Sequence, residues 1–125
     1  MKPLLLALTL GLAAFRVAAG NGASAAGVAS WYGEDHRGRL MANGKQFNPD
    51  HLTAASWFYP LGTKVCVTLK SQNQSPRSVL VTITDRGPAK ELVREGRIID
   101  LTHAAFKRLG HPKVGLVAVT VEPSN

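Results

Sequence analysis

Short runs rich in β-branched residues, each closed by a turn signal, are the feature that most restricts how this chain can fold. Residues 64–69 alternate basic or polar side chains with apolar ones, which is typical of a half-buried strand. Residues 77–84 are rich in Val, Ile and Thr, and this composition favours a second long strand. Further strands are predicted at residues 28–32, 97–101 and 114–122, with turn signals at residues 42–44, 60–62, 72–76 and 86–88. With 12 Gly and 7 Pro in 125 residues, the chain is predicted to be mainly β.

One short α-helix is predicted among these strands, at residues 103–109. Thr102 is a good N-cap for this helix, and Gly110 is placed to end it. Asp100 stands just before the helix N-terminus, where the helix dipole favours a carboxylate. A domain this small protects its strand edges most economically by closing the sheet on itself, so we expect a closed barrel.

The amino-terminal segment has the composition of an export signal. Lys2 precedes an uncharged apolar run at residues 3–15, and residues 17–27 are mostly Ala, Gly and Ser. The apolar run is shorter than the ~20 residues that a membrane-spanning helix needs. A buried N-terminal helix is the alternative, but the run has no polar face. The pattern therefore predicts a secretory signal peptide.

Export fixes the expected domain organisation and location. We expect a signal peptide at residues 1–26, with small residues that allow cleavage after Ala19 or Ala25, and one domain at residues 27–125. No Cys lies near either cut, so we expect no lipid anchor, and no transmembrane helix should remain after cleavage. The protein is predicted to reside in the periplasm or cell envelope, or to be secreted.

Charge narrows the range of partners. The chain has 15 Lys and Arg residues against 8 Asp and Glu, a formal charge of +7. For an exported domain we expect no nucleic acid partner; an anionic wall polymer or phospholipid surface fits better. Solubility alone is the other explanation, because the basic residues form no run. We expect a monomer.

Cysteine and histidine content excludes two kinds of stabilising site. Cys66 is the single cysteine, so an intrachain disulfide is impossible. It lies in the middle of a predicted strand, where we expect a buried and inert thiol. The four His residues are dispersed, so we expect no metal site and no cofactor.

Six short motifs occur in a fixed order along the predicted domain. They are Gly-Val-Ala-Ser-Trp-Tyr-Gly at 27–33, Ala-Asn-Gly at 42–44, Leu-Thr-Ala-Ala at 52–55, Leu-Gly-Thr at 61–63, Thr-Asp-Arg-Gly-Pro at 84–88 and Arg-Ile-Ile-Asp-Leu at 97–101. The ordered set resembles the rare lipoprotein A (RlpA) family of bacterial envelope proteins, over nearly the whole predicted domain. The resemblance implies a six-stranded double-psi β-barrel and peptidoglycan glycan strands as the substrate.

The same resemblance implies an enzyme, an endolytic lytic transglycosylase that leaves 1,6-anhydromuramyl ends. In the family an acid follows the Ala-Asn-Gly turn, a His follows Leu-Thr-Ala-Ala, and an Asp opens Asp-Arg-Gly-Pro. Here the third position is Asp85, whereas Lys45 and Ser56 stand at the first two. Transglycosylation activates no water, so one carboxyl can serve as both acid and base. The resemblance therefore makes Asp85 the expected general acid/base.

A non-catalytic module that binds glycan or loosens walls is the alternative function, because expansins are similar at Asp85 and Asp100 and use aromatic faces to grip sugars. A secreted domain that binds a protein partner is a third possibility. The expected substrate-binding residues are Trp31, Tyr32, Asn43, Lys45, Ser56, Trp57, Arg86 and Asp100.

Structural roles compete with these functional ones. Asp85 can close a turn or pair with Arg97, and Asp100 can serve the helix start. Trp31 and Tyr32 can belong to the core. Residues 57–59 are three consecutive aromatics, so at least one of them should be exposed if the segment is extended.

Overall fold

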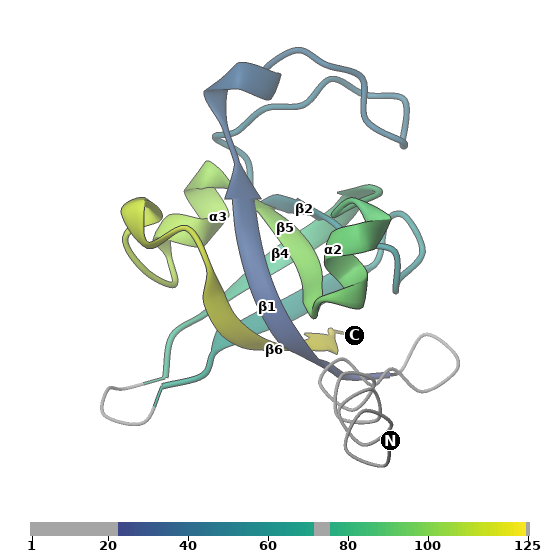
Figure 1. Cartoon of the computed structure of the whole chain (residues 1–125). Helices are drawn as coiled ribbons and strands as arrows, with labels where there is room; N and C mark the ends of the chain where they lie inside the picture. Colours follow the sequence, from purple (N-terminus) through teal and green to yellow (C-terminus); the bar gives the residue numbers. More distant parts are fainter. Residues whose placement is uncertain (1–22, 72–75, 125) are drawn as a thin grey trace.

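A barrel of six strands forms the domain in the computed structural model, which describes residues 23–71 and 76–124. The strands are β1 (Ala25–Tyr32), β2 (Thr53–Ala55), β3 (Lys64–Leu69), β4 (Ser78–Asp85), β5 (Arg97–Thr102) and β6 (Val117–Pro123). They close in the order β1-β5-β2-β4-β3-β6, as Figure 1 shows. The six-stranded, mainly β architecture expected of a double-psi barrel is confirmed.

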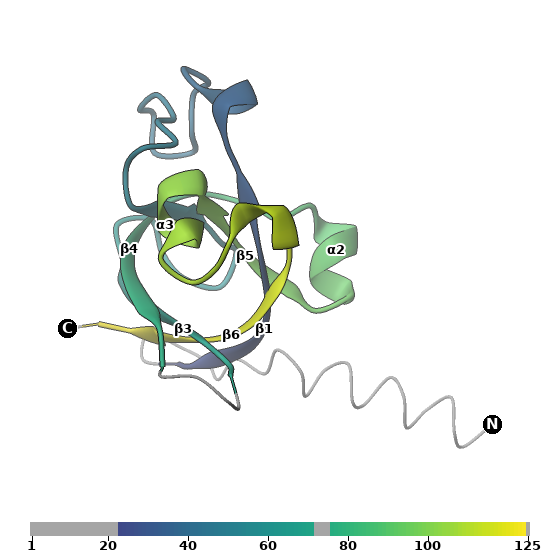
Figure 2. The same ribbon diagram turned by 90° about the vertical axis from the view of Figure 1, so that its left-hand side faces the viewer.

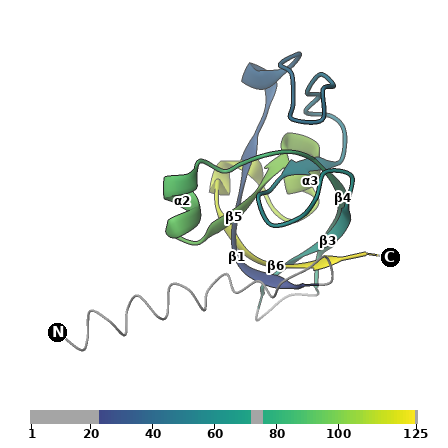
Figure 3. The ribbon, with the colours of Figure 1, turned by 90° about the vertical axis from the view of Figure 1, so that its right-hand side faces the viewer.

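Parallel and antiparallel pairs are mixed around the ring. β1 pairs with β5 and β2 pairs with β4 in parallel, and the remaining pairs are antiparallel. The strands close a ring in Figures 2 and 3, which view the barrel from its two sides. A closed ring leaves no strand edge exposed, which suits a domain of this size.

The alternation read in residues 64–69 is confirmed in β3. Val65 and Val67 are fully buried in the core, while Cys66 between them faces outward. Cys66 is only partly buried, so the expectation of a buried thiol is wrong. Successive side chains of a strand point to opposite faces of the sheet, so Cys66 faces outward while its valine neighbours face the core.

β5 is buried on both faces, which explains why its sequence does not alternate cleanly. Ile98 and Ile99 are both buried. Helix α2 (Lys90–Arg94) lies against β5 on the outside of the barrel, as Figure 1 shows. This helix was not predicted. It has no side-chain cap and no buried residue, so it left no periodic pattern.

The predicted helix is α3 (His103–Lys107). Thr102 caps it as expected, because its Oγ1 accepts a hydrogen bond from the Ala105 amide at 3.2 Å. Ala105 and Phe106 anchor the helix in the core. The expectation of one helix is thus corrected to two short α-helices, with 3₁₀ turns at Glu34–His36 and Pro112–Val114.

Two strands differ from the sequence prediction. β2 was not predicted from local pattern, because it has three residues and two of them are Ala. The last strand begins at Val117, since the 3₁₀ turn occupies the start of the predicted run.

β1 begins before the predicted domain boundary. Ala25 pairs with Val121 of β6, and the buried Tyr59 hydroxyl donates a 3.0 Å hydrogen bond to the Ala23 carbonyl. The predicted signal peptide at 1–26 lies mostly outside the described residues. Within the described part of the chain, no helix is long and apolar enough to cross a membrane.

A long segment at residues 33–52 joins β1 to β2 and extends beyond the barrel, at the top of Figure 1. The turn at 41–46 in this segment is fixed by hydrogen bonds from Met41 N to Lys45 O at 2.8 Å and from Gly44 N to Met41 O at 2.9 Å. Residues of this segment line two pockets beside the barrel.

Candidate functional site

A row of four residues crosses the outer wall of the barrel on adjacent strands. Ser30 of β1 is paired with Asp100 of β5, Asp100 with Ala55 of β2, and Ala55 with Asp85 of β4. Paired residues share a face of the sheet. The residues next to this row along the strands belong to the core, so the row itself faces outward; these core residues are Ala29, Ile99, Leu101, Ala54 and Ile83. We call Ser30, Asp100, Ala55 and Asp85 the carboxyl row. One strand, β2, lies between the strands that carry the two acids, and this corresponds to about 10 Å between their backbones.

A register shift on β2 and β4 brings Asp85 into this row. Its Oδ1 accepts hydrogen bonds from the amides of Ala42 and Arg86, both at 2.9 Å. The Asn43 amide also donates to the Thr84 carbonyl at 3.2 Å. Asp85 therefore fastens the 41–46 turn to the end of β4.

Asp85 makes no ion pair with Arg97 among the residues that the structure describes, where both salt bridges involve Arg37. Of the two structural roles weighed for Asp85, turn closure is the one found.

Asp100 has different surroundings, although it lies in the same row. Its carboxylate accepts a hydrogen bond from the Ser30 hydroxyl. Burial raises the pKa of Asp100, and the Asp85 charge adds to this, while the Ser30 hydrogen bond and the charges of Arg97 and His36 act in the opposite direction. Burial is the largest of these causes, so the protonated form is favoured relative to a free aspartate.

The backbone of Gly87 lies over the middle of the row. A methyl group at Gly87 would lie 3.4 Å from both Asp100 Oδ2 and the Ala55 side chain. A side chain at this position would therefore contact the Asp100 carboxyl directly.

Ser56 and Arg86 support the turn that follows β4. The Ser56 amide donates to the Asp85 carbonyl at 3.1 Å, and the Arg86 guanidinium donates to the carbonyls of Ser56 and Tyr59 at 2.7 and 2.6 Å. Ser56 is 1% exposed, and its hydroxyl accepts from the Phe58 amide at 3.1 Å. These predicted ligand-binding residues are thus engaged in holding two loops together.

Trp57 is the exposed member of the aromatic triplet, at 42% exposure, which agrees with the prediction that at least one of the three would be exposed. Its indole Nε1 donates to the Pro88 carbonyl at 2.6 Å, and Lys90 Nζ lies 4.9 Å from the ring centroid. The ring is therefore fixed beside the turn at 85–88, on the side of the row nearer α2.

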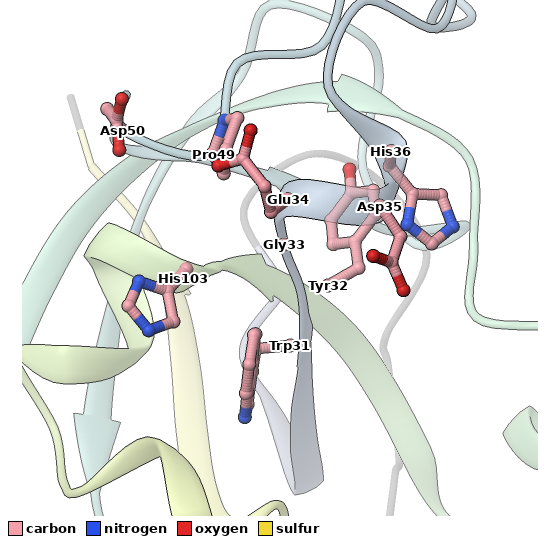
Figure 4. A pocket seen from close by; sticks show the side chains of 9 residues that line it. All are labelled: Trp31, Tyr32, Gly33, Glu34, Asp35, His36, Pro49, Asp50 and His103. Atoms are coloured by element: carbon pink, nitrogen blue, oxygen red, sulfur yellow. The ribbon is translucent and has the colours of Figure 1, made fainter.

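A pocket of about 490 Å³ lies where β1 ends, and we call it the β1 pocket. Figure 4 shows Trp31 and His103 on one side of the strand end and Tyr32, Asp35 and His36 on the other. Trp31 packs against His103 with ring centroids 4.9 Å apart, and its Nε1 donates to the Pro112 carbonyl at 2.9 Å. Trp31 is thus held in a fixed orientation at the pocket wall.

Tyr32 links this pocket to the carboxyl row. Its ring stacks on Phe47 at 4.3 Å, and His36 packs edge-on against it at 5.3 Å. The Tyr32 hydroxyl and His36 Nδ1 are buried and have no hydrogen-bond partner within residues 23–71 and 76–124. Burial raises the pKa of Tyr32, with smaller contributions from Asp85 and Asp100. Tyr32 therefore stays a neutral hydroxyl close to both acids.

The rim of the β1 pocket is acidic. Arg37 pairs with Glu34 at 2.5 Å and with Asp50 at 3.0 Å, which ties the 34–37 segment to the start of the 50–52 segment. Asp35 also lines the pocket. All three acids belong to the long segment between β1 and β2.

A second pocket, of about 590 Å³, lies against β2 and β4, and we call it the Lys45 pocket. Its lining includes Thr53 and Thr82 on the strands and Asn43 and Lys45 of the 41–46 turn. Asn43 Oδ1 accepts from the Lys45 amide at 2.9 Å. None of the described residues that line this pocket is acidic.

The structure brings together some predicted site residues and separates others. Asp85, Asp100 and Tyr32 gather at the carboxyl row, and Asn43 and Lys45 gather beside it. Sequence reasoning missed Ser30, His36 and Phe47, because their places follow from strand register and loop packing, which no local motif records. No cluster of three or more His, Cys, Asp or Glu suited to a metal ion occurs in the described residues.

Comparisons with known proteins identify a matching family model and similar sequences. The family model described as lytic transglycolase matches residues 24–121. The "Probable endolytic peptidoglycan transglycosylase RlpA" of Synechocystis sp. (strain PCC 6803) is 43% identical over 96 residues, which are 77% of this chain and 28% of that protein. The "Endolytic peptidoglycan transglycosylase RlpA" of Pseudomonas aeruginosa (strain UCBPP-PA14) is 40% identical over 96 residues, 77% of this chain and 26% of that protein. The chain thus spans about a quarter of the length of these relatives.

Among solved structures, the Streptomyces papain inhibitor is similar with a TM-score of 0.61 and 22% identity, covering 89% of this chain and 99% of that one. This likeness supports the barrel fold.

Proposed function

The chain belongs to the RlpA-like lytic transglycolase family, and from this premise we propose that it is an exported endolytic transglycosylase that cuts peptidoglycan glycan strands. The observation that carries the proposal is the carboxyl row, where a partly buried acid with a raised pKa lies beside Gly87, in a wall that two pockets flank. Lytic transglycosylation needs such an acid, because a proton must reach the leaving oxygen at neutral pH.

We assign the proton transfer to Asp100. The Asp100 carboxyl gives its proton to the glycosidic oxygen as the bond from that oxygen to the muramyl C1 breaks. The muramyl C6 hydroxyl oxygen then bonds to C1, and its proton passes to the Asp100 carboxylate. The enzyme regains its starting protonation state, and the products are a 1,6-anhydromuramyl end and a free 4-hydroxyl.

Asp85, the acid expected from the family pattern, takes a positioning role in this scheme. Its Oδ1 is occupied by the amides of Ala42 and Arg86, which fixes the 41–46 turn beside the row. The departures at Lys45 and Ser56 are then compatible with activity, because neither position has to supply a proton to the leaving group.

Aromatic side chains supply sugar-binding faces in this proposal. The half-buried Trp31 lines the β1 pocket, and the exposed Trp57 stands on the other side of the turn at 85–88. Both indole nitrogens are hydrogen-bonded to backbone carbonyls, so the rings are fixed before a sugar arrives.

Export follows the sequence prediction, and the fold suggests where the leader is cut. Cleavage after Ala25 would remove the Ala23 carbonyl that Tyr59 binds and the Ala25–Val121 pair. Cleavage after Ala19 leaves both intact, so we propose that cut, giving an unlipidated, monomeric protein in the periplasm, the cell envelope or the medium. N-terminal sequencing of protein purified from its native envelope tests this, and retention of residues 1–15 would contradict export.

A non-catalytic, wall-loosening module is the second candidate. It is favoured by Ser56, because the residue at the family's His position is buried and engaged in a loop contact. Such a module would bind purified sacculi without releasing anhydro-sugars.

Product analysis separates the two candidates. The exported protein is incubated with glycan strands stripped of stem peptides, beside Asp100→Asn, and soluble products are identified by mass spectrometry. Anhydromuramyl ends from the wild type, absent with Asp100→Asn, are the expected result. Sedimentation with sacculi and no products from either protein would favour the wall-loosening module instead.

A further inference from the structure

The two pockets beside the carboxyl row differ in charge. Three acids line the β1 pocket, namely Glu34, Asp35 and Asp50, and only two of them are paired with Arg37. Among the described residues, the Lys45 pocket is lined by one lysine and by no acid. In the barrel order, the β1 pocket lies at the β1 end of the four-strand wall and the Lys45 pocket at its β4 end. A ligand that crosses the row therefore meets opposite charges on its two sides.

Lys45 is held in a defined place relative to the row. Its carbonyl accepts from the Met41 amide at 2.8 Å, and its amide donates to Asn43 Oδ1 at 2.9 Å. The same turn is fastened to Asp85 Oδ1 through the Ala42 amide at 2.9 Å. The backbone of Lys45 is thus connected to a row acid through a short chain of hydrogen bonds.

The Lys45 side chain is free to meet a ligand. It is exposed, and no salt bridge engages it within residues 23–71 and 76–124. Thr53 and Thr82, with neutral hydroxyl groups, line the same pocket. An ammonium group in a pocket with neutral polar side chains suits a carboxylate, to which it can make a charge-assisted hydrogen bond.

We propose that the Lys45 pocket takes a sugar bearing a free carboxylate, and that Lys45 thereby fixes the register of the glycan on the carboxyl row. The inference rests on the proposed function. In a peptide-free glycan strand, N-acetylmuramyl residues carry a lactyl carboxylate and alternate with neutral N-acetylglucosamine. A carboxylate in the β1 pocket would face Asp35 and the Glu34–Arg37–Asp50 group, so the neutral sugar suits that side. Opposite charge preferences at the two pockets disfavour a strand shifted by one sugar.

The test measures binding rather than cleavage. Two fluorescently labelled tetrasaccharides of alternating N-acetylglucosamine and N-acetylmuramic acid are compared, one with free lactyl carboxylates and one with these converted to methylamides. All proteins carry Asp100→Asn to prevent cleavage, and anisotropy is recorded near physiological ionic strength. With Lys45 present, we expect the free carboxylates to bind about 5-fold more tightly, as for a partly exposed charge pair.

Variants at position 45 decide the assignment. Lys45→Met should bind the two ligands equally, Lys45→Arg should keep the preference, and Lys45→Glu should reverse it. Lys107→Met is the matched control, because Lys107 is an exposed lysine at the end of α3 and lines neither pocket. It should keep the full preference.

The possible failures are distinguishable. Equal binding of both ligands by the protein with Lys45, or a preference that survives Lys45→Met, overturns the inference and leaves the proposed function standing. Binding of neither ligand by any protein overturns both.

Discussion

The end of β4 and the middle of β5 each carry a carboxyl group on the outer wall of the barrel, with β2 between them. The two carboxyl groups have different surroundings. Asp85 is held by two backbone amides and fastens a turn. Asp100 is held by one hydroxyl, and burial is the largest influence on its pKa. The comparison teaches that hydrogen-bond partners and burial, rather than residue type or motif, give two acids of one row different surroundings.

Loss of the Asp100 carboxyl should have the largest effect. Asp100→Asn keeps the shape and an acceptor for Ser30 but cannot transfer a proton, so we expect kcat/KM on stripped glycan strands to fall by about 10³-fold. Asp85→Asn keeps an acceptor for the two amides and should cost only about 10-fold. The measurement is initial rate by mass spectrometry of anhydromuramyl ends. The reverse order of losses would return the acid/base role to Asp85.

Removal of the Asp85 side chain should expose its structural role. Asp85→Ala leaves the amides of Ala42 and Arg86 without their acceptor, and we expect unfolding free energy to fall by about 2 kcal/mol. Hydrogen exchange should accelerate at these two amides first. Asp85→Asn serves as the control, because it retains the acceptor oxygen. Unchanged exchange in Asp85→Ala would show that the turn is held by its other contacts.

The difference in stability between wild type and Asp100→Asn should depend on pH in a direction set by the raised pKa of Asp100. Because the folded state holds the proton more tightly than the unfolded chain, wild-type stability falls as pH rises from the usual aspartate pKa of about 3.9 through the raised value. Asp100→Asn lacks this loss. Thermal unfolding should therefore show the variant more stable than wild type at neutral pH and equal to it in acid. Wild type gaining stability relative to the variant as pH rises would contradict the raised pKa.

Ser30→Ala should have the smallest effect. The Ser30 hydrogen bond lowers the pKa of Asp100, so its removal raises that pKa further. Since kcat/KM for a proton donor falls as pH rises through its pKa, the alkaline limb of the rate profile should move to higher pH. Ser78→Ala, at an exposed position of β4, is the matched control and should leave the profile unchanged. A shift to lower pH in Ser30→Ala would contradict the assigned role of the hydroxyl.

The sequence predicted most of the barrel, and the misses have physical causes. The alternation around Val65 and Val67 located β3, and the Thr102 cap located α3. β2 was too short to show a period, and α2 buries no residue that would have produced one. The same alternation places Cys66 on the outer face, because it lies between two buried valines of one strand.

The candidate site divides in the same way. Ordered motifs determined the family and named Asp85, Asp100, Tyr32 and Lys45, because each lies in or beside a short motif that the sequence itself displays. Tertiary structure decided which groups surround each acid, which of the named residues hold loops, and which sides of the row are acidic or basic. Register between strands joined Ser30 to Asp100 across 70 positions of sequence. The burial of Asp100 and the charges around it depend on closure of the barrel, which brings together residues far apart in the sequence. No local pattern of residues encodes that closure.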